Sequence, residues 1–476
     1  WSWTTGTHKK ITAYVAKGEC LKNTMSSGAA GQDSRRTVFS DKLLKWLSVD
    51  YKALWSQSRL SSNKKRVEEE HLHIQAASRI EQLPPYLFAR INKLTYEKRR
   101  SGCDVIDMSM GNPSDPPAQF IIDKLAEAAS DTRNHGYAPA TGVVSLRREV
   151  ASRYLRKWGV RLDPETEVLG TLGSKEGFGH LCLAMIDPGD DVIVPAPSYP
   201  AHVYAVALAS GNPIAIDTTK PDKFLSEISA RCGSKAGPPK VLVINFPHNP
   251  TTTVVEKEFY EDVISVAEQY DFPIISDLAY SDVVFDGYET PSILAVKGAK
   301  ERAVEFTTMS KGYSMAGWRV GFCAGNDDII KALGTVKTYY DYGMFRPIQI
   351  AARVALRNGE ADVANQSQIY QRRRDVLCEG LGRIGWHVAV PKASMFVWAK
   401  IPEPFASQMN SMDFAAKLLE EADVAVSPGA GFGPAGEGFL RMALIENENR
   451  IRQAVKQIGR AIGAELRSCE KEVPAE

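Results

Sequence analysis

The chain has 476 residues, of which 44% are hydrophobic and 24% are charged, and its formal net charge is +1. This length allows more than one domain, and the balanced charge argues against a dedicated nucleic-acid-binding protein. No apolar run approaches the roughly 18 residues that a membrane-spanning helix needs, so we expect no membrane segment. The seven cysteines are scattered without a C-x2-C pair. We therefore expect neither a metal site nor a disulfide framework.

The first 75 residues differ in composition from the rest of the chain. Residues 1–66 are rich in lysine, arginine, serine and threonine. Their only acidic residues are Glu19, Asp33, Asp41 and Asp50. This composition is typical of an organelle transit peptide, which would direct the protein to a mitochondrion or plastid. Two alternatives remain open: a disordered leader without function, or sequence upstream of a start at Met25. In either case a cytoplasmic location is expected.

From Ile80 onward, short apolar runs alternate with helical patterns. The first elements expected are a helix that ends near Arg100, a short strand at 105–110 and loops at 111–117 and 136–142. Further helices are expected at Ser174–Met185 and Glu256–Tyr270. Further strands are expected at Val192–Val194, Val241–Ile244, Pro273–Asp277, Val304–Phe306 and Val320–Phe322. Such alternation predicts an α/β fold with a mostly parallel sheet that helices cover on both faces.

The last third of the chain has a different pattern. A strand pair is expected at 387–390 and 394–398, followed by a closing helix. The apolar residues of that helix recur at helical spacing: Ile451, Ala454, Val455, Ile458, Ala461 and Ile462. We expect an N-terminal arm with part of a small domain at 76–128, a large domain at 129–345 and a small C-terminal α+β domain at 346–476.

Three polar residues follow successive predicted strands of the large domain. Asn249 lies beyond Val241–Ile244, Asp277 ends the next strand, and Lys311 lies beyond Val304–Phe306. Open α/β sheets bind ligands at the carboxyl ends of their strands. We therefore expect these three residues to form one site.

The surroundings of Lys311 suggest a particular cofactor. A lysine amine can form a Schiff base with an aldehyde. Thr308, Ser310 and Arg319 lie close by in the sequence, and hydroxyl and guanidinium groups suit a phosphate. Pyridoxal 5'-phosphate (PLP) carries both an aldehyde and a phosphate. The alternative for Lys311 is an ordinary surface lysine in a loop.

Together these segments resemble the fold-type I, PLP-dependent aminotransferases of class I/II over about residues 80–466. The resemblance is strongest to bacterial-type glutamate–pyruvate (alanine) aminotransferases. The shared runs lie at 173–177, 277–280, 341–343 and 391–395. The resemblance implies a seven-stranded, mostly parallel sheet with a smaller α+β domain, and ping-pong transfer of an amino group that serves alanine biosynthesis.

The resemblance implies a role for each residue around the cofactor ring. Lys311 would bond to the aldehyde and later move a proton, and Asp277 would pair with the pyridine nitrogen. Tyr280 and Asn249 would hydrogen-bond the phenolic oxygen, and Tyr199 would stack on the ring. The alternatives are a turn-capping aspartate, a common Asn-Pro turn and a core tyrosine.

A second group of residues would hold the phosphate. Ser174 and Lys175 open a predicted helix after a glycine, where backbone N–H groups and the helix dipole attract anions. They would act together with Thr308, Ser310 and Arg319. A plain helix cap is the alternative for Ser174. The resemblance also implies that Tyr137 reaches the phosphate of a neighbouring subunit, which predicts a homodimer.

Arg441 is a charged residue within an apolar, strand-like run, and a buried charge needs a partner. The resemblance implies the α-carboxylate of the substrate as that partner; the alternative is an ion pair with Glu446. Gly111, Tyr86 and Asn249 would also border the substrate. Arg346 is a candidate to bind a second carboxylate, although an exposed arginine at a helix start is the simpler interpretation.

The substrates that the resemblance implies are alanine or glutamate with pyruvate or 2-oxoglutarate. LL-diaminopimelate aminotransferases have a similar phosphate loop. They carry a glutamate where this chain has Ala140 and an asparagine where it has Tyr342, which argues against that substrate. A PLP-dependent lyase shares the same core residues. A PLP-binding regulator would need a DNA-binding winged helix, and the leader lacks the necessary helical pattern.

Overall fold

The computed structural model describes residues 75–81, 83 and 88–470, with side chains up to residue 466. The described residues from Ala76 onward form one compact unit. The predicted leader up to residue 74 and the predicted pocket residue Tyr86 lie outside the described residues. None of the described helices is both long and apolar enough to cross a bilayer.

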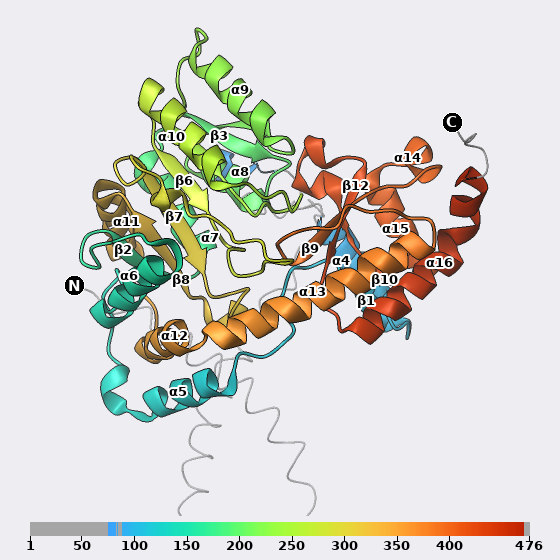
Figure 1. Cartoon of the computed structure of the whole chain (residues 1–476), viewed down its shortest axis with the longest axis horizontal. Helices are drawn as coiled ribbons and strands as arrows, with labels where there is room; N and C mark the ends of the chain where they lie inside the picture. Colours follow the sequence, from blue (N-terminus) through green and yellow to red (C-terminus); the bar gives the residue numbers. More distant parts are fainter. Residues whose placement is uncertain (1–74, 82, 84–87, 471–476) are drawn as a thin grey trace, which may run out of the picture. The chain divides into compact units, whose positions relative to one another are not determined.

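A seven-stranded sheet forms the centre of the larger part (Figure 1). The strand order is β2-β8-β7-β6-β5-β3-β4. Only β8 runs antiparallel to its neighbours, and the other pairs are parallel. The strands are β2 (Val168–Thr171), β3 (Asp191–Ala196), β4 (Asn212–Asp217), β5 (Val241–Ile244), β6 (Ile274–Asp277), β7 (Ala303–Thr308) and β8 (Gly321–Gly325). The predicted mostly parallel sheet is confirmed.

Helices bury both faces of this sheet. Along β5, Leu242 and Ile244 belong to one hydrophobic cluster, whereas Val241 and Val243 belong to another on the opposite face. This explains the continuous apolar sequence of the strand. On the first face lie α5 (Gln119–Ser130), α6 (Val144–Trp158), α9 (Pro221–Cys232), α10 (Lys257–Tyr270) and α12 (Arg346–Asn358). On the other lie α7 (Ser174–Met185), α8 (Pro200–Leu208) and α11 (Asp327–Tyr340).

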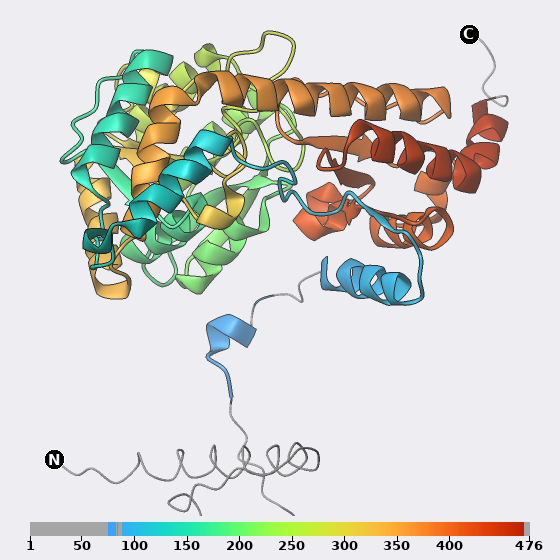
Figure 2. The ribbon, with the colours of Figure 1, turned by 90° about the horizontal axis from the view of Figure 1, so that it is seen from below.

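A second hydrophobic core forms around a small antiparallel sheet of order β11-β12-β9. Its strands are β9 (Phe396–Lys400), β11 (Ser427–Pro428) and β12 (Phe439–Ala443), and a separate parallel pair joins β1 (Ile106–Asp107) to β10 (Val424–Ala425). The helices here are α4 (Phe88–Arg100), α13 (Glu360–Arg383), α14 (Phe405–Gln408), α15 (Ser411–Ala422) and α16 (Glu448–Glu470). The long helix α13 runs from the region of α12 to these helices (Figures 1 and 2).

The remaining described helical elements are single turns. They are α3 (Ser78–Glu81), η1 (Thr132–Asn134), η2 (Ile293–Ala295), η3 (Ala316–Trp318), η4 (Gly429–Phe432) and η5 (Pro434–Gly436). The turn η3 lies between Lys311 and Arg319 in the sequence and ends directly before Arg319.

The strand predicted at 387–390 is wrong, and strand β4 of the large sheet was not predicted. Residues 387–390 are not a strand, and β9 pairs with β12 instead. Val390 is exposed, and only Val388 of this stretch packs against the second core, so the alternating apolar pattern does not mark a buried strand face. Strand β4 did not stand out in the sequence because it is an edge strand with a proline at position 213, and neither feature produces a strong strand pattern.

The two hydrophobic clusters show where the chain passes from one core to the other. Ile121 of α5 and residues 351–356 of α12 pack in the cluster of the large sheet, whereas Tyr370 and Leu377 of α13 pack in the second core. The change from one core to the other therefore falls within α13. The division at 128/129 and 345/346 stays a prediction.

Candidate active site

Asn249, Asp277 and Lys311 follow three neighbouring strands, β5, β6 and β7, at the same edge of the sheet. Asn249 links this edge to two other predicted site residues. Its Nδ2 donates to Tyr280 Oη at 3.4 Å, and its Oδ1 accepts from Arg441 Nη1 at 2.8 Å. The structure therefore brings together residues that lie up to 192 positions apart in the sequence.

Lys311 is a buried amine rather than a surface lysine. Its Nζ donates to the carbonyl oxygen of Gly111 at 2.5 Å. Burial, and then the positive charges of Arg441 and Arg319, lower the pKa of Lys311 to about 8. An amine with this pKa gives up its proton more readily than an ordinary lysine, which suits a nucleophile or a base.

Asp277 ends β6 and has one occupied and one free carboxylate oxygen. Oδ2 lies 2.9 Å from His202 Nε2, and the main-chain carbonyl accepts from Asn245 Nδ2 at 2.7 Å. Oδ1 is buried without a hydrogen-bond partner among the described residues. A buried carboxylate oxygen in this state favours a ligand that brings a donor or a positive charge.

His202 is a site residue that the sequence analysis missed. It lies on α8, three residues after the N-cap residue Tyr199, and their ring centroids are 5.5 Å apart. It is almost fully buried against Asp277. The spacing from Tyr199 is the only local signal, and nothing in the sequence indicates the contact with Asp277.

The start of α7 has the geometry of an anion site. Gly173 precedes the helix with a φ of 81°, and Ser174 is its first residue, so Ser174 does not cap it as the simpler interpretation supposed. A Cβ atom at Gly173 would lie 2.2 Å from Arg319 Nη2, and one at Gly321 would lie 2.5 Å from the Ser174 nitrogen. The two glycines therefore let Arg319 and β8 approach the helix N-terminus closely.

Three other predicted phosphate ligands lie at the end of β7 or in the segment that follows it: Thr308, Ser310 and Arg319. Thr308 Oγ1 is 2.9 Å from Ser310 Oγ and 3.0 Å from the carbonyl oxygen of Val320. Arg319 has a left-handed φ of 57°, and its Nη2 donates to the carbonyl oxygen of Leu172 at 3.1 Å. Lys175 is exposed at the start of α7.

Arg441, on β12, is only 6% exposed and lies between two aromatic rings. Its guanidinium carbon is 4.0 Å from the ring centroid of Phe396 and 4.5 Å from that of Phe432. Besides Asn249, its guanidinium binds the carbonyl oxygen of Ser109 at 3.2 Å. The rings hold the planar group in place, as suits two-pronged binding of a carboxylate.

Two further predicted residues border this region. A Cβ atom at Gly111 would lie 2.5 Å from Phe396 Cζ, so a larger residue would not fit there. Tyr280 is buried, and burial raises the pKa of its phenol well above the usual range. Its ring centroid is 5.7 Å from that of Phe396.

The structure does not bring Tyr137 to the other predicted cofactor ligands. Its side chain is 82% exposed, and its ring centroid lies 4.5 Å from that of the exposed Tyr342. Arg346 donates to the carbonyl oxygens of Arg133 and Tyr137 at 3.2 and 3.5 Å. Arg346 therefore supports the Tyr137 loop.

Among the residues that the structure describes, one group of side chains has the donor spacing that a metal ion would need: Glu176, His180 and Asp341. The buried ammonium of Lys337 lies 2.9 Å from both carboxylates of this group. A cation therefore already balances them, and the group carries no metal assignment. The expectation of no metal stays a prediction.

Comparisons with known proteins agree on one family. The family described as aminotransferase class I and II matches residues 103–458. The chain is 47% identical over 381 residues to the glutamate-pyruvate aminotransferase AlaC of Escherichia coli, covering 80% of this chain and 92% of that protein. It is 40% identical over 390 residues to the LL-diaminopimelate aminotransferase of Moorella thermoacetica, covering 82% and 99% of the two chains.

Solved structures give the same result. Substrate-bound BacF from Bacillus subtilis has a TM-score of 0.76 at 30% identity and covers 82% of this chain and 98% of its own. A double mutant of Thermus thermophilus aspartate aminotransferase has a TM-score of 0.75 at 28% identity, with 82% and 100% covered. The fold is that of the fold-type I aminotransferases. The chain belongs to the aminotransferase class I and II family, and it is an enzyme that transfers amino groups between amino acids and oxo acids.

Proposed function

We propose that this enzyme uses PLP to exchange an amino group between alanine or glutamate and pyruvate or 2-oxoglutarate. The observation that carries the proposal is the buried, unpartnered Oδ1 of Asp277. It lies at the end of a strand whose neighbour leads to Lys311, a buried amine with a lowered pKa. A cofactor with a ring nitrogen and an aldehyde needs a carboxylate to pair with the nitrogen and an amine to bond to the aldehyde.

The residues at this edge of the sheet fit such a cofactor. Lys311 would bond to the aldehyde carbon, and Asp277, oriented by His202, would keep the ring nitrogen protonated. When bound, PLP supplies a positively charged ring that accepts the electron pair left after Cα loses its proton. The residues that would hold it are Lys311, Asp277, Tyr280, Asn249, Tyr199, Ser174, Lys175, Thr308, Ser310 and Arg319.

The remaining chemistry belongs to the chain itself. Arg441 would bind the substrate α-carboxylate in two-pronged fashion, which aligns Cα with the Lys311 amine. Once the substrate amine has displaced it from the aldehyde carbon, the free Lys311 amine would move the proton from Cα to that carbon. Its lowered pKa supports this role, because a base works best when its pKa lies near the working pH.

The proposed substrates rest on the activities of two relatives and on two residues of this chain, Ala140 and Tyr342. A relative at 47% identity is a glutamate-pyruvate aminotransferase. Relatives at 40% identity are LL-diaminopimelate aminotransferases, which makes that substrate the second candidate. This chain has Ala140 and Tyr342 at the two positions where we expect polar residues to bind the distal end of diaminopimelate, so alanine and glutamate are favoured.

A panel of amino donors and oxo-acid acceptors tests the substrate proposal. We expect alanine with 2-oxoglutarate, and glutamate with pyruvate, to give the highest kcat/KM values. LL-diaminopimelate should react poorly, because its second ammonium and carboxylate would lack partners in the pocket. Efficient turnover of LL-diaminopimelate, with little reaction of alanine, would refute the substrate assignment while leaving the aminotransferase class intact.

We also propose that the enzyme works as a homodimer whose sites share Tyr137 across the interface. The exposed ring of Tyr137 lies 4.5 Å from that of the exposed Tyr342, and three more exposed aromatic residues lie within three positions of Tyr342 in the sequence: Tyr339, Tyr340 and Phe345. Such a cluster on one part of the surface is typical of an interface. Burial against a second copy would remove it from water and place Tyr137 near the neighbouring phosphate site.

Mixing two inactive variants tests the shared site. A Tyr137→Ala chain and a Lys311→Ala chain should regain activity together, because each heterodimer contains one site with both residues intact. The parent homodimers serve as controls. Native mass spectrometry with one tagged chain shows whether heterodimers form. If they form and activity does not return, Tyr137 of one subunit does not complete the site that contains Lys311 of the other.

A further inference from the structure

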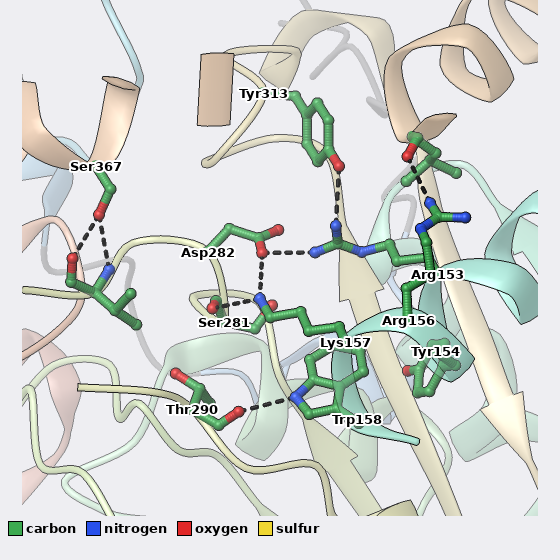
Figure 3. A network of polar contacts seen from close by, with 12 residues as sticks. Arg153, Tyr154, Arg156, Lys157, Trp158, Ser281, Asp282, Thr290, Tyr313 and Ser367 are labelled. Carbon is green, nitrogen blue, oxygen red and sulfur yellow. Dashed lines mark hydrogen bonds and ion pairs between the residues drawn. The ribbon is translucent and has the colours of Figure 1, made fainter. Parts of the chain in front are cut away.

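One buried arginine connects the two loops that carry the proposed catalytic groups. Arg153, on α6, is 8% exposed. Its Nη2 donates to Asp282 Oδ1 at 2.6 Å, and its Nη1 donates to Tyr313 Oη at 3.0 Å (Figure 3). These contacts span 129 and 160 positions of the sequence, so they join segments that lie far apart along the chain.

Each partner of Arg153 lies next to a proposed catalytic residue. Asp282 lies in the turn that the Val283 nitrogen closes on the carbonyl oxygen of Tyr280, at 3.0 Å. Tyr313 lies two residues after Lys311, in the turn whose Ser314 nitrogen is 3.4 Å from the carbonyl oxygen of Lys311. A movement of either partner is therefore carried to the neighbouring catalytic group through only two peptide units.

The two loops also pack directly against each other. A Cβ atom added to Gly312 would lie 2.6 Å from the Cβ atom of Asp282. No larger residue fits at position 312 unless the loops separate. The Lys311 loop thus rests on the Asp282 turn, and Arg153 binds both from the side (Figure 3).

Two positive charges meet one buried carboxylate at this junction. Lys157, one helical turn after Arg153, donates to the same Asp282 oxygen at 2.5 Å. Burial alone would raise the pKa of Asp282, but Arg153 and Lys157 lower it well below the usual range. Burial raises the pKa of Tyr313 to about 12, so its phenol stays neutral and can accept the hydrogen bond from Arg153. Charged hydrogen bonds in a buried setting are strong and directional.

We propose that Arg153 is a positioning residue for amino transfer, which sets the place of Lys311 relative to Asp277 and Tyr280 through Tyr313 and Asp282. The inference rests on the proposed roles of these groups. An amine that must reach both a cofactor carbon and a substrate proton tolerates little displacement. A misplacement of about 1 Å can lower a rate on the order of 100-fold.

Tyr313→Phe is the sharpest test, because it removes only the oxygen that Arg153 binds and keeps the ring packed. We expect kcat to fall about tenfold, with a change in KM for the amino donor of less than about twofold, because the loss affects orientation rather than carboxylate binding. The rate at which the apo-protein bonds to added PLP, followed by absorbance, should fall by a similar factor.

Ser367→Ala is the matched control. Ser367 Oγ donates to the carbonyl oxygen of Val284 at 2.5 Å and accepts from its nitrogen at 3.0 Å, so it holds the same loop as Asp282 (Figure 3). It contributes no described contact to the Lys311 loop. We expect this variant to lower the melting temperature while kcat and the rate of PLP bonding change less than about twofold.

Arg153→Met extends the test to the arginine itself. In that background Tyr313→Phe should have no further effect on either rate, because both changes act through one contact. If Arg153→Met does not fold, the comparison of Tyr313→Phe with Ser367→Ala decides alone. Wild-type rates in Tyr313→Phe, or an equal loss in Ser367→Ala, would overturn the proposal. A wild-type protein that forms no bond with PLP would instead overturn the proposed cofactor, and this proposal with it.

Discussion

Replacing Lys311 with alanine should lower kcat/KM by about 10²- to 10⁴-fold for every donor, the range that general acid–base catalysis supplies. The amine is buried against the Gly111 carbonyl, and its lowered pKa makes it partly neutral near pH 8. Lys311→Arg should be as inactive, because a guanidinium keeps its proton. The measurement is steady-state kinetics with alanine and 2-oxoglutarate.

The control for this experiment is a lysine far from the site. Lys331, on the exposed surface of α11, can be replaced with alanine without touching any proposed ligand. It should keep activity within about twofold, as surface changes usually do. More than a tenth of wild-type activity in Lys311→Ala would contradict the proposed role, because no other described lysine is proposed to bond to the cofactor or to move the proton.

Arg441→Ala should damage alanine and glutamate turnover alike. A charged hydrogen bond to a bound carboxylate contributes roughly 1.5–3 kcal/mol, which corresponds to about one to two decades in kcat/KM. Both substrates carry the same α-carboxylate, so both should lose this amount. Arg441→Lys should recover only part of the loss, because an ammonium cannot make the paired contact that the guanidinium makes between Phe396 and Phe432.

Arg346→Ala is the matched variant for this prediction. Arg346 already donates to two backbone carbonyls of the Tyr137 loop. Its loss should spare alanine, and it should reduce glutamate turnover only if the second carboxylate of glutamate binds there. Arg441→Ala kinetics within about threefold of wild type, or a loss confined to one of the two substrates, would refute the assignment of Arg441 to the α-carboxylate.

Much of this site follows from local sequence pattern. The strand Val241–Ile244 and the helix Ser174–Met185 begin and end where the sequence predicts. The reason is that a strand buried on both faces reads as a short continuous apolar run, and a helix that follows a glycine has a recognisable start, so a single segment reveals each of them. Asn249, Asp277 and Lys311 could then be placed at one edge of the sheet, because parallel strands align their carboxyl ends.

Contacts between distant segments leave no such pattern. His202 meets Asp277 across 75 positions and Arg153 meets Tyr313 across 160, so no local rule reveals either pair. The strand predicted at 387–390 was wrong for a related reason. The partner of β9 is β12, about 40 positions later, and pairing is set by the tertiary structure rather than by neighbouring sequence.

The location of the cofactor is the most direct test of the account. The purified protein should be incubated with PLP, reduced with borohydride and digested, and the modified peptide should be identified by mass spectrometry. We predict that the cofactor is fixed to Lys311, and that the Lys311→Ala protein carries no adduct. An adduct on another lysine of the wild-type protein, or no adduct at all, would contradict the proposed active site.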